Sequence, residues 1–455
     1  MLHRSLAVSL LLVAAITAAA VEVSEIPRPN LSNAAVAALI AQDPQQAHEL
    51  GRILFTRQFT AREGAGAARR TTMRGAQAQS CGVCHNVPYG EAGSGATIGR
   101  SGPTGRNTPH LFGAGLMEKI GQAITSELLK QVDLNGDGWV GASEAHGRQA
   151  TIDPDGAGPE AVLDFGAYLT DDHPALDPAL RIWYVASDGR RIPAARALTD
   201  PGVAGYRFAC GTFGWSAADG EDPRATASLR GFVVGAFAAH AGLEVDDLQL
   251  IEDDGSGFSL PESDGTRSLF IGALPDPGIR RDAAGRSLDD PDGDGVPSEM
   301  TGSDIDLVTT YLRTLAQPIE RAGASGFQHG RELFASIGCT ACHVPDWHLP
   351  NLNVSGIYSD FRHHDLGTAF HQRRFDGGVT TRFRTPPLWG VGTSAPYGHD
   401  GASLDLPAVI ERHAGEATTA ALAYAALRQS EQADLLSFLR GLVLPHQEPR
   451  ANSRQ

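Results

Sequence analysis

Two short stretches of the chain have the residue types and the spacing that attach a haem covalently. Cys81-Gly-Val-Cys-His85 and Cys339-Thr-Ala-Cys-His343 both read C-x-x-C-H. In this motif the two thiols form thioethers with the haem vinyl groups, and the histidine supplies the proximal imidazole to iron. With five cysteines and sixteen histidines in 455 residues, about 0.002 chance matches are expected per chain. Two copies therefore predict two c-type haems. The expected attachment residues are Cys81, Cys84, His85, Cys339, Cys342 and His343.

For a single copy, a disulfide-forming C-x-x-C or half of a zinc site would be the alternative. Neither explains why a histidine directly follows both cysteine pairs. A zinc site also needs a second pair of ligands nearby. His343 and His348 provide such a pair for the later copy, whereas nothing comparable follows Cys84. The fifth cysteine, Cys210, is interpreted as a buried structural thiol.

The sequence around the two haem motifs is repeated, which indicates how they are positioned. Gly51-Arg-Ile-Leu-Phe55 lies upstream of the first motif, and Gly330-Arg-Glu-Leu-Phe334 precedes the second. Downstream, Thr108-Pro-His-Leu-Phe-Gly-Ala-Gly115 is echoed by Thr385-Pro-Pro-Leu-Trp-Gly-Val-Gly392. The shared order predicts two related haem domains. In each, we expect the G-R-x-L-F stretch on an amphipathic helix and the T-P stretch in a loop over a haem edge.

Hydrophobic periodicity predicts a mainly α fold. Few runs alternate with period two, whereas helical periodicity recurs in several segments. These segments are 124–132, 229–241, 305–315 and 420–442. The expected architecture is two cytochrome c-like haem domains related by internal duplication, over residues 45–317 and 318–447. A loop-rich insert of about 121–317 belongs to the first domain.

The insert contains a calcium-binding pattern of the EF-hand type. Residues 133–144 place oxygen donors at positions 1, 3 and 5, a carbonyl at 7, glycine at 6 and glutamate at 12. The expected ligands are Asp133, Asn135, Asp137, Trp139 through its carbonyl, and Glu144. A second stretch from Asp290 begins in the same way but ends in Thr301, where a bidentate carboxylate belongs. Its calcium interpretation is weaker, with Glu299 as a substitute ligand.

The N-terminus and the net charge indicate where the protein works. Residues 1–20 combine a positively charged start, a short apolar run and a small-residue end, as in a cleaved signal peptide. A retained anchor is the alternative, but the run is short for a membrane span. Because haem attachment to C-x-x-C-H occurs outside the cytoplasm, we expect a periplasmic protein. The net charge of -16 argues against nucleic acid or anionic membranes as partners.

The chain resembles the bacterial di-haem cytochrome c peroxidase superfamily, and most of all its long di-haem oxidoreductase branch, which is also called thiol-oxidoreductase-like. The resemblance runs from 51 to 442. The stretches that carry it are Arg106-Asn-Thr-Pro109, Phe213-Gly-Trp215, Tyr358-Ser-Asp360, His364-Asp-Leu-Gly367, Phe383-Arg-Thr-Pro-Pro-Leu-Trp389, Ala395-Pro-Tyr-Gly-His-Asp-Gly401 and His413-Ala-Gly-Glu-Ala417.

This resemblance implies a division of labour between the haems and a calcium ion between them. In the superfamily the C-terminal haem stores an oxidising equivalent and exchanges electrons, while the N-terminal haem meets peroxide. By resemblance, the calcium ligands fall on Asn107 and on the carbonyls of Ser394 and Pro396. Serine stands where the family has threonine, which matters little for a backbone ligand. A supporting histidine of the family falls on His399.

The sixth ligand of the C-terminal haem is expected to be a histidine. The family often uses methionine, but none of the four methionines of this chain follows His343. The position at which the family places its ligand falls on His413 here. Other imidazoles within reach remain alternatives, namely His363, His364 and His371. A surface histidine at a helix end is the further alternative for His413.

Three more residues are candidates for the chemistry at the N-terminal haem. Trp215 matches the family's inter-haem electron relay. His240 stands where the family has a distal glutamate that shuttles protons, and an imidazole can transfer protons near neutral pH. It could instead ligate the N-terminal iron, or be an ordinary helix residue. Glu118 is the reserve distal carboxylate.

Two classes of function follow. The first is a di-haem oxidoreductase in which hydrogen peroxide or a related oxidant reacts at the N-terminal haem. A small carrier, either a cytochrome c or a cupredoxin, would deliver electrons through the C-terminal haem; a variant oxidises a protein or thiol substrate. The second class is a non-catalytic electron-transfer cytochrome with both irons six-coordinate.

Overall fold

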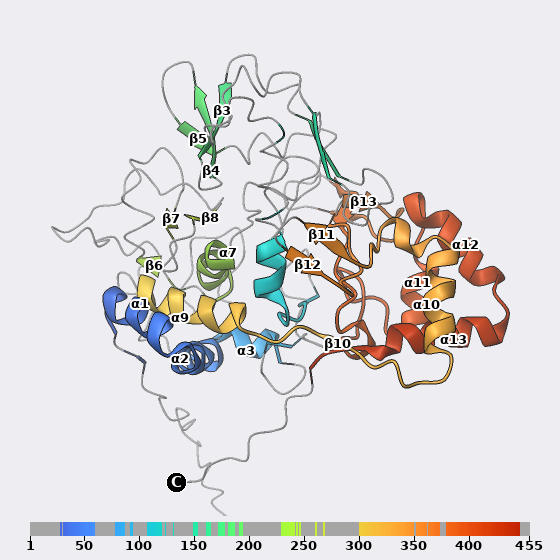
Figure 1. Cartoon of the computed structure of the whole chain (residues 1–455), viewed down its shortest axis with the longest axis horizontal. Helices are drawn as coiled ribbons and strands as arrows, with labels where there is room; N and C mark the ends of the chain where they lie inside the picture. Colours follow the sequence, from blue (N-terminus) through green and yellow to red (C-terminus); the bar gives the residue numbers. More distant parts are fainter. Residues whose placement is uncertain are drawn as a thin grey trace, which may run out of the picture.

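The computed structural model places two groups of helices on either side of a short linker (Figure 1). It describes residues 28–29, 31–59, 78–86, 92–93, 107–120, 123, 131, 149–152, 161–164, 172–177, 181–186, 191–193, 229–241, 243, 245–246, 260–261, 267–268, 300–349, 352–361, 363–373 and 379–445. The predicted signal peptide, Cys210, Trp215, the loop 133–144 and Glu299 lie outside these residues. Among the described residues, no helix has the length and apolar character needed to cross a bilayer.

The helices of the first group come from two parts of the chain, one before residue 121 and one between residues 229 and 313. They are α1 (Asn33–Gln42), α2 (Pro44–Thr56), α3 (Cys81–Cys84), α7 (Leu229–Ala236), the π-helical turn η3 (Phe237–Ala241) and α9 (Gly302–Arg313). A further helical segment covers 114–120. Helix α9 packs along α2 and α7, so the chain returns to its first helices after the insert.

The second group is contiguous in sequence. Its helices are α10 (Phe327–Ser336), α11 (Leu406–Glu411), α12 (Thr418–Ala426) and α13 (Gln429–Gly441), with the 3-10 turns η4 (Cys339–Ala341), η5 (Val391–Thr393) and η6 (Gly415–Ala417). Helices α10 and α13 pack against each other. This group occupies the right side of Figure 1.

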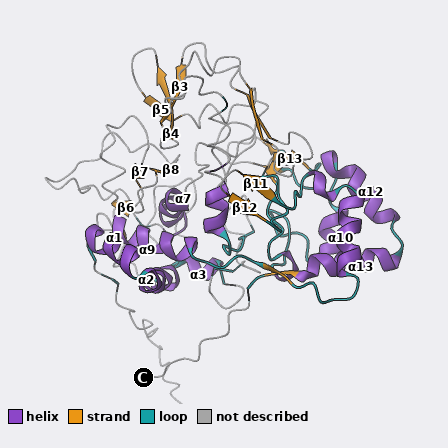
Figure 2. Cartoon of the chain, in the orientation of Figure 1, coloured by secondary structure: helices purple, strands orange, loops and turns teal. Residues whose placement is uncertain are grey.

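The described strands are short and pair in sheets of two or three (Figure 2). The antiparallel pairs and triplet are β1 (Gln149–Ile152) with β2 (Ala161–Asp164), β3 (Asp172–Asp177) with β4 (Arg181–Ala186) and β5 (Arg191–Pro193), β7 (Leu260–Pro261) with β8 (Arg267–Ser268), β10 (Ile319–Glu320) with β17 (Leu442–Val443), β11 (Trp347–Leu349) with β12 (Leu352–Val354), β13 (His363–Asp365) with β16 (Arg382–Arg384), and β14 (Gln372–Arg373) with β15 (Val379–Thr380). Strands β6 (Val245–Asp246) and β9 (Met300–Thr301) pair in parallel. The predicted mainly α character is confirmed.

Local sequence explains where the principal helices begin. Asp43 caps α2 by accepting a hydrogen bond from Gln46 N at 3.0 Å, and Pro44 occupies the first turn, where it removes no helical hydrogen bond. Thr301 and Asp304 form a capping box at the start of α9. The last position of the second calcium-like loop, Thr301, is therefore used as a helix cap.

Each helix group has its own apolar core. The first core is built from α1, α2, α7, η3 and α9, and it includes Phe55, Phe237 and Tyr311. The second is built from α10 to α13 with residues of the preceding loops, and it includes Phe334, Tyr358 and Phe438. Two cores on the two sides of the linker agree with a boundary near 317, which stays a prediction.

The repeated glycines sit where helices cross closely. A Cβ on Gly51 would lie 1.9 Å from the Leu307 carbonyl oxygen of α9, and a Cβ on Gly330 would lie 2.0 Å from the Asp434 carbonyl oxygen of α13. Any side chain would separate these helices. The first residue of each G-R-x-L-F stretch is thus fixed by the same kind of contact in both groups.

Helix α9 is buried along most of its length, so its acidic residues require partners. Asp306 pairs with Arg230 at 2.7 Å, with side-chain exposures of 9% and 1%. Asp304 pairs with Arg28 at 2.6 Å. Arg313, in the last turn of the helix, pairs with Glu118 at 2.7 Å. These ion pairs tie α7 and the 114–120 segment to α9.

Candidate haem centres

The first attachment motif lies on the single helical turn α3, directly after which the chain reaches His85. Its ring Nδ1 lies 2.8 Å from the carbonyl oxygen of Pro109. A carbonyl only accepts a hydrogen bond, so Nδ1 carries the proton and Nε2 carries the lone pair. Phe55, at the end of the G-R-x-L-F stretch, packs near the imidazole with ring centroids 6.0 Å apart.

The second motif has the same local arrangement on the 3-10 turn η4. The Nδ1 atom of His343 lies 3.0 Å from the carbonyl oxygen of Tyr358, which again leaves the lone pair on Nε2. Phe334 lies near this imidazole, with ring centroids 6.1 Å apart. An imidazole with its Nδ1 hydrogen bonded to a carbonyl is the usual form of a metal-ligating histidine.

Electrostatics keep both histidines neutral at neutral pH. Burial lowers the pKa of His85 to about 4, and the carbonyls of Pro109 and Gly93 only partly oppose this. Burial lowers the pKa of His343 to about 4 as well, against the Tyr358 carbonyl. A neutral imidazole is the form that binds iron. The residues of both centres therefore fit a covalently attached haem, which would supply the redox chemistry.

The imidazole of His413 makes the same kind of hydrogen bond as the two proximal histidines. It follows α11, and its Nδ1 donates to the Val409 carbonyl oxygen at 2.7 Å, so its Nε2 also carries a lone pair. It is close enough to His343 for its charge to lower the pKa of His343. Burial lowers the pKa of His413 itself. The structure thus brings together His343 and the histidine predicted to face it.

The alternative ligands are engaged with carboxylates. Both ring nitrogens of His364 bond to acids, Nε2 to Asp360 at 2.8 Å and Nδ1 to Glu416 at 2.7 Å. Burial opposes a charge on His364, but the hydrogen bond to Asp360 raises its pKa above the ordinary value. A ring with protons on both nitrogens has no lone pair for iron. His371 bonds to Asp365 at 2.9 Å. The side chain of His363 lies outside the described residues.

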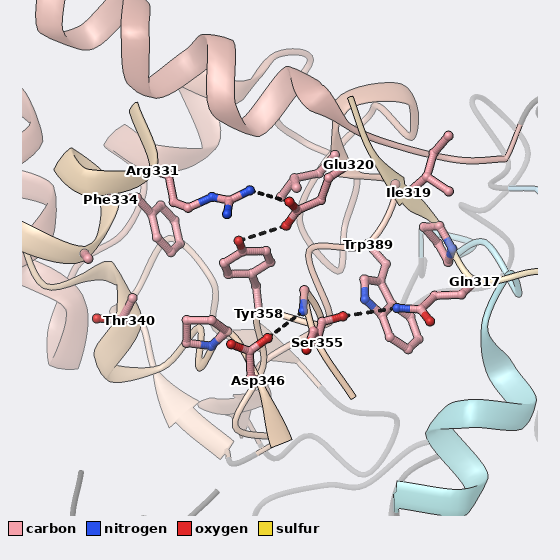
Figure 3. A pocket seen from close by; sticks show the side chains of 16 residues that line it. Gln317, Ile319, Glu320, Arg331, Phe334, Thr340, Asp346, Ser355, Tyr358 and Trp389 are labelled. Atoms are coloured by element: carbon pink, nitrogen blue, oxygen red, sulfur yellow. Dashed lines mark hydrogen bonds and ion pairs between the residues drawn. The ribbon is translucent and has the colours of Figure 1, made fainter. Parts of the chain in front are cut away.

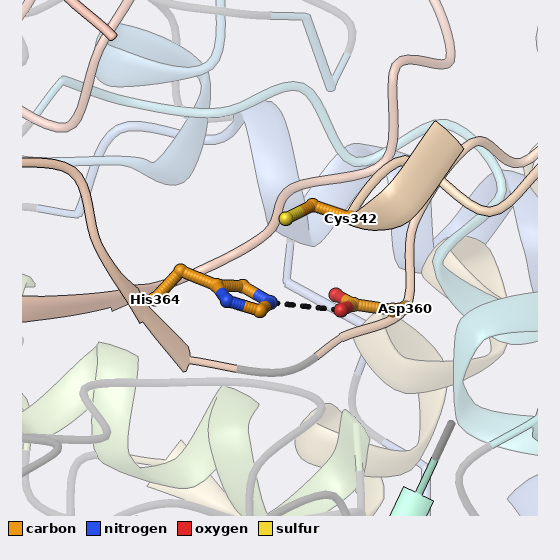
Figure 4. Close-up of side chains that lie close together, drawn as sticks. All are labelled: Cys342, Asp360 and His364. Carbon is orange, nitrogen blue, oxygen red and sulfur yellow. Dashed lines mark hydrogen bonds and ion pairs between the residues drawn. The ribbon is translucent and has the colours of Figure 1, made fainter. Parts of the chain in front are cut away.

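Cys342, Asp360 and His364 form a compact group, with ligand atoms within 4.8 Å of one another (Figure 4). Such a group could hold a metal ion. However, Cys342 belongs to an attachment motif, and a thioether sulfur is a poor ligand for hard cations. We interpret Asp360 and His364 as an ion pair beside the haem-attachment turn.

Part of this chain is similar to known proteins. Residues 266–442 match the family model described as "Di-haem oxidoreductase, putative peroxidase". This part of the chain is similar to that family. The match begins in the insert and covers the whole second helix group, with the second C-x-x-C-H motif and His413.

Among solved structures, hydrazine synthase of Kuenenia stuttgartiensis matches with 21% identity and a TM-score of 0.24, over 32% of this chain and 57% of that chain. A MauG-like protein associated with microbial copper homeostasis matches with 22% identity and a TM-score of 0.22, over 31% of this chain and 57% of that chain. The chain thus covers little more than half of each. No curated protein matches.

His240, the candidate distal residue, lies on the π-helical turn η3. Single π-helical turns are frequent at functional sites. His240 is close enough to His85 for its charge to lower the pKa of His85. Although its ring reaches the surface, the protein packed around it lowers its own pKa below the ordinary value. His240 thus lies near the first haem centre, and its role as the distal residue stays a prediction.

Glu118, the reserve candidate, has a structural role in the described part of the chain. Its two carboxylate oxygens accept hydrogen bonds from Arg313 at 2.7 and 3.0 Å, and Oε1 also accepts from the backbone N–H of Leu229 at 2.8 Å. These bonds anchor the start of α7 to the end of α9. They favour a structural role for this carboxylate over proton transfer.

Asn107 joins the two halves of the chain at the expected inter-domain calcium site. Its backbone N–H donates to the His399 carbonyl oxygen at 2.7 Å, and its side-chain Nδ2 lies 2.6 Å from the Pro396 carbonyl oxygen. A half-turn of the Asn107 amide would place Oδ1 beside this carbonyl, as two oxygen ligands of one cation require. Ser394 ends the neighbouring turn η5.

A cavity of about 410 Å³ lies next to the second haem centre (Figure 3). Tyr358 and Trp389 line it together with the linker residues 317–320. The Tyr358 hydroxyl donates to Glu320 Oε1 at 3.0 Å, and Arg331 pairs with the other carboxylate oxygen. Burial and the charge of Glu320 raise the pKa of Tyr358 well above its ordinary value, which keeps the phenol protonated. The acid–phenol contact fixes the linker to the second core.

We expect the stability of the chain before haem binding to fall at mildly acidic pH. In the unfolded chain His85 and His343 bind a proton below about pH 6.5, but in the folded chain only below about pH 4. The unfolded state then binds more protons, so the free energy of unfolding decreases as pH falls through this window. The slope is at most about 1.4 kcal/mol per pH unit for each histidine. Guanidinium denaturation across the window measures it, and a pH-independent midpoint would contradict it.

Proposed function

We propose that the chain is an exported di-haem c-type oxidoreductase of the peroxidase kind. It reduces hydrogen peroxide or a related oxidant at the N-terminal haem, with electrons delivered through the C-terminal haem by a small carrier such as a cytochrome c or a cupredoxin. Reduction of one peroxide takes two electrons and two protons and yields two waters. The observation that carries the proposal is the matching hydrogen bond of the two proximal histidines, each of which lies near a second histidine.

At the C-terminal centre, the imidazoles of His343 and His413 make the same kind of hydrogen bond. Each donates Nδ1–H to a backbone carbonyl and keeps its Nε2 lone pair. A haem between them would be six-coordinate, which suits electron exchange rather than substrate binding. At the N-terminal centre, His240 is near His85. We propose a closed electron-exchange site at His343 and His413 and an open substrate site at His85.

In this proposal His240 moves protons at the N-terminal site. Its lowered pKa keeps a neutral imidazole near pH 7, able to take a proton from peroxide and return it to the leaving oxygen. Trp215 remains the proposed inter-haem relay by resemblance, and the calcium loop 133–144 remains a proposed structural site.

We further propose that the two helix groups are haem domains related by duplication. The glycines at the α2–α9 and α10–α13 crossings and the phenylalanines beside each proximal histidine support this. Gly115 and Gly392, the last residues of the two T-P stretches, also match. A Cβ on each would lie 2.2 and 2.4 Å from the carbonyl oxygens of Arg313 and Arg440, at the ends of α9 and α13.

One observation favours a second function, that of a non-catalytic electron-transfer cytochrome. His240 is near enough to His85 to interact with it electrostatically, so a modest movement of η3 would bring a second imidazole to the N-terminal iron. Oxidation of a protein or thiol substrate is the catalytic variant of the first proposal, and it shares the same two haem centres.

The spectrum of the N-terminal haem separates these functions. We expect a high-spin signal in the oxidised or half-reduced protein, together with electron-donor oxidation on addition of hydrogen peroxide. The variant His240→Gln should slow peroxide turnover by about 10²-fold, the range for a general acid–base residue, without abolishing the high-spin signal. Two low-spin haems in all redox states, and no peroxide turnover, would favour the carrier.

Calcium removal is a separate test of the proposed inter-domain site. Asn107 contacts the loop that carries Pro396 and His399 across the boundary between the helix groups, so an ion there would fix the relative position of the haems. We expect chelation to change the haem spectra or slow inter-haem electron transfer, and Asn107→Ala to mimic it. Unchanged spectra and rates in calcium-depleted protein would count against this site, whatever the state of the loop 133–144.

A further inference from the structure

A continuous series of bonds begins at the proximal histidine of the N-terminal centre and crosses to the other helix group. His85 Nδ1 donates to the Pro109 carbonyl at 2.8 Å. The next residue, His110, reaches across the boundary, and its Nε2 lies 2.5 Å from the Trp389 carbonyl oxygen. Because a carbonyl only accepts, Nε2 of His110 is the protonated nitrogen.

The series continues to the proximal histidine of the C-terminal centre. Trp389 is joined by its peptide bond to Leu388, whose N–H donates to the Ile357 carbonyl oxygen at 3.1 Å. Ile357 is followed by Tyr358, and the Tyr358 carbonyl accepts the Nδ1–H of His343 at 3.0 Å. Four hydrogen bonds and the covalent segments between them therefore connect the two proximal imidazoles.

We propose that this path couples the two haems electronically and that His110 is the side chain that bridges it. One electron passes between the haems along the path, no bond is broken, and His110 keeps its Nε2 proton throughout. The proposal rests on the proposed function, in which electrons must move from the C-terminal to the N-terminal haem. It adds a route through the proximal ligands, distinct from the relay expected at Trp215.

The contact between the two T-P stretches is built for close approach. A Cβ on Gly113 would lie 2.5 Å from Cζ3 of Trp389, and a Cβ on Gly390 would lie 2.2 Å from Cδ2 of Leu444 and 3.2 Å from Nε2 of His110. Both glycines have positive φ, 79° for Gly113 and 70° for Gly390, and they occupy the same position in the two repeats. Gly113 thus leaves room for the ring of Trp389, and Gly390 leaves room for Leu444 and His110.

The first T-P stretch supplies the histidine of this bridge, and the second stretch has no matching side chain. The residue at the position of His110 in the second stretch is Pro387, which has no side-chain donor. Burial lowers the pKa of His110 to about 4, against its bond to the Trp389 carbonyl, so the ring is neutral. Nδ1 of His110 and Nε1 of Trp389 are buried without a hydrogen-bond partner in the described part of the chain. Their rings are therefore committed to this contact and not to solvent.

The test compares His110→Gln with His110→Leu in the haem-loaded protein. Glutamine can place an amide N–H near the Trp389 carbonyl, whereas leucine keeps the bulk without a donor. The measurement is the rate at which an electron redistributes between the haems of one-electron-reduced protein after a light pulse. We expect a severalfold slower rate in the leucine variant, a rate near the parent in the glutamine variant, and unchanged haem spectra in both.

Controls keep the result interpretable. His329→Gln changes a histidine that bonds to Asp434 at 2.8 Å, outside the path, and should leave the rate unchanged. If the leucine variant does not fold, His110→Asn replaces it, because its amide is too short to reach the carbonyl. Equal rates in the glutamine variant and in the variant without the bond, or no electron exchange in the parent, would overturn the proposal. Peroxide turnover is scored separately, so a protein that exchanges electrons through His110 without reducing peroxide refutes only the proposed function.

Discussion

Replacing His413 with glycine is expected to remove the sixth ligand of the C-terminal haem and with it the low-spin bis-histidine spectrum. The reason is that His413 is the described histidine near His343 whose Nδ1 bonds a carbonyl, while its Nε2 keeps a lone pair. The His413→Met variant should retain six-coordination and raise the haem potential, because a thioether is a weaker donor than imidazole. Optical and magnetic spectra together with redox titration measure both effects.

A matched control is His371→Gln, which changes a histidine already bonded to Asp365 at 2.9 Å. It should leave the spectrum and the potential of the haem unchanged. If both His413 variants keep the parent spectrum and potential, the ligand lies elsewhere. In that case His364 would have to release Asp360 or Glu416 to bind iron, and His364→Gln would be the variant that loses the signal.

The sequence was sufficient to predict features that depend on local chemistry. The attachment residues follow from the C-x-x-C-H motif, and His413 follows from the absence of a methionine after His343 together with the family resemblance. The repeated glycines Gly51 and Gly330 were visible as a pattern, and the structure supplies their reason, which is a helix carbonyl within about 2 Å of the missing side chain.

Contacts between distant segments could not be predicted in the same way. The carbonyl that holds His85 comes from the T-P stretch, whereas the carbonyl that holds His343 comes from Tyr358, although the repeats suggest the same partner. Nothing in the sequence pairs His110 with Trp389, because the residues are 279 positions apart. The sequence does carry one signal for this contact, because His110 of the first T-P stretch corresponds to Pro387 in the second, one of three positions at which the stretches differ.

The partners of buried charged residues could not be predicted from the sequence either. Glu118 has the residue type of a distal acid, but its oxygens are used by Arg313 and by the start of α7. Its pairing depends on α9 returning to the first helix group after the insert. His364 was one of the alternative candidates for the iron ligand, but both of its ring nitrogens bond to carboxylates in the structure. In both cases the residue type was informative and the partner decided the role.

The second large effect is expected from the attachment cysteines. Mass spectrometry of the denatured, haem-loaded parent should show two haem additions per chain, because thioethers survive denaturation. Replacing both Cys81 and Cys84 with serine should leave one addition, and replacing both Cys339 and Cys342 should also leave one.

The control for these variants is Cys210→Ser, which should keep both additions because Cys210 belongs to neither motif. Loss of one haem should also remove one set of absorption bands. Serine at Cys81 and Cys84 should leave the spectrum of the bis-histidine centre at His343 and His413, whereas serine at Cys339 and Cys342 should remove it. A parent chain with a single addition, a disulfide between Cys81 and Cys84, or a double variant that keeps both additions would each show that the motif does not hold a haem at that place. The two double variants thus assign each haem, and each spectrum, to one half of the chain.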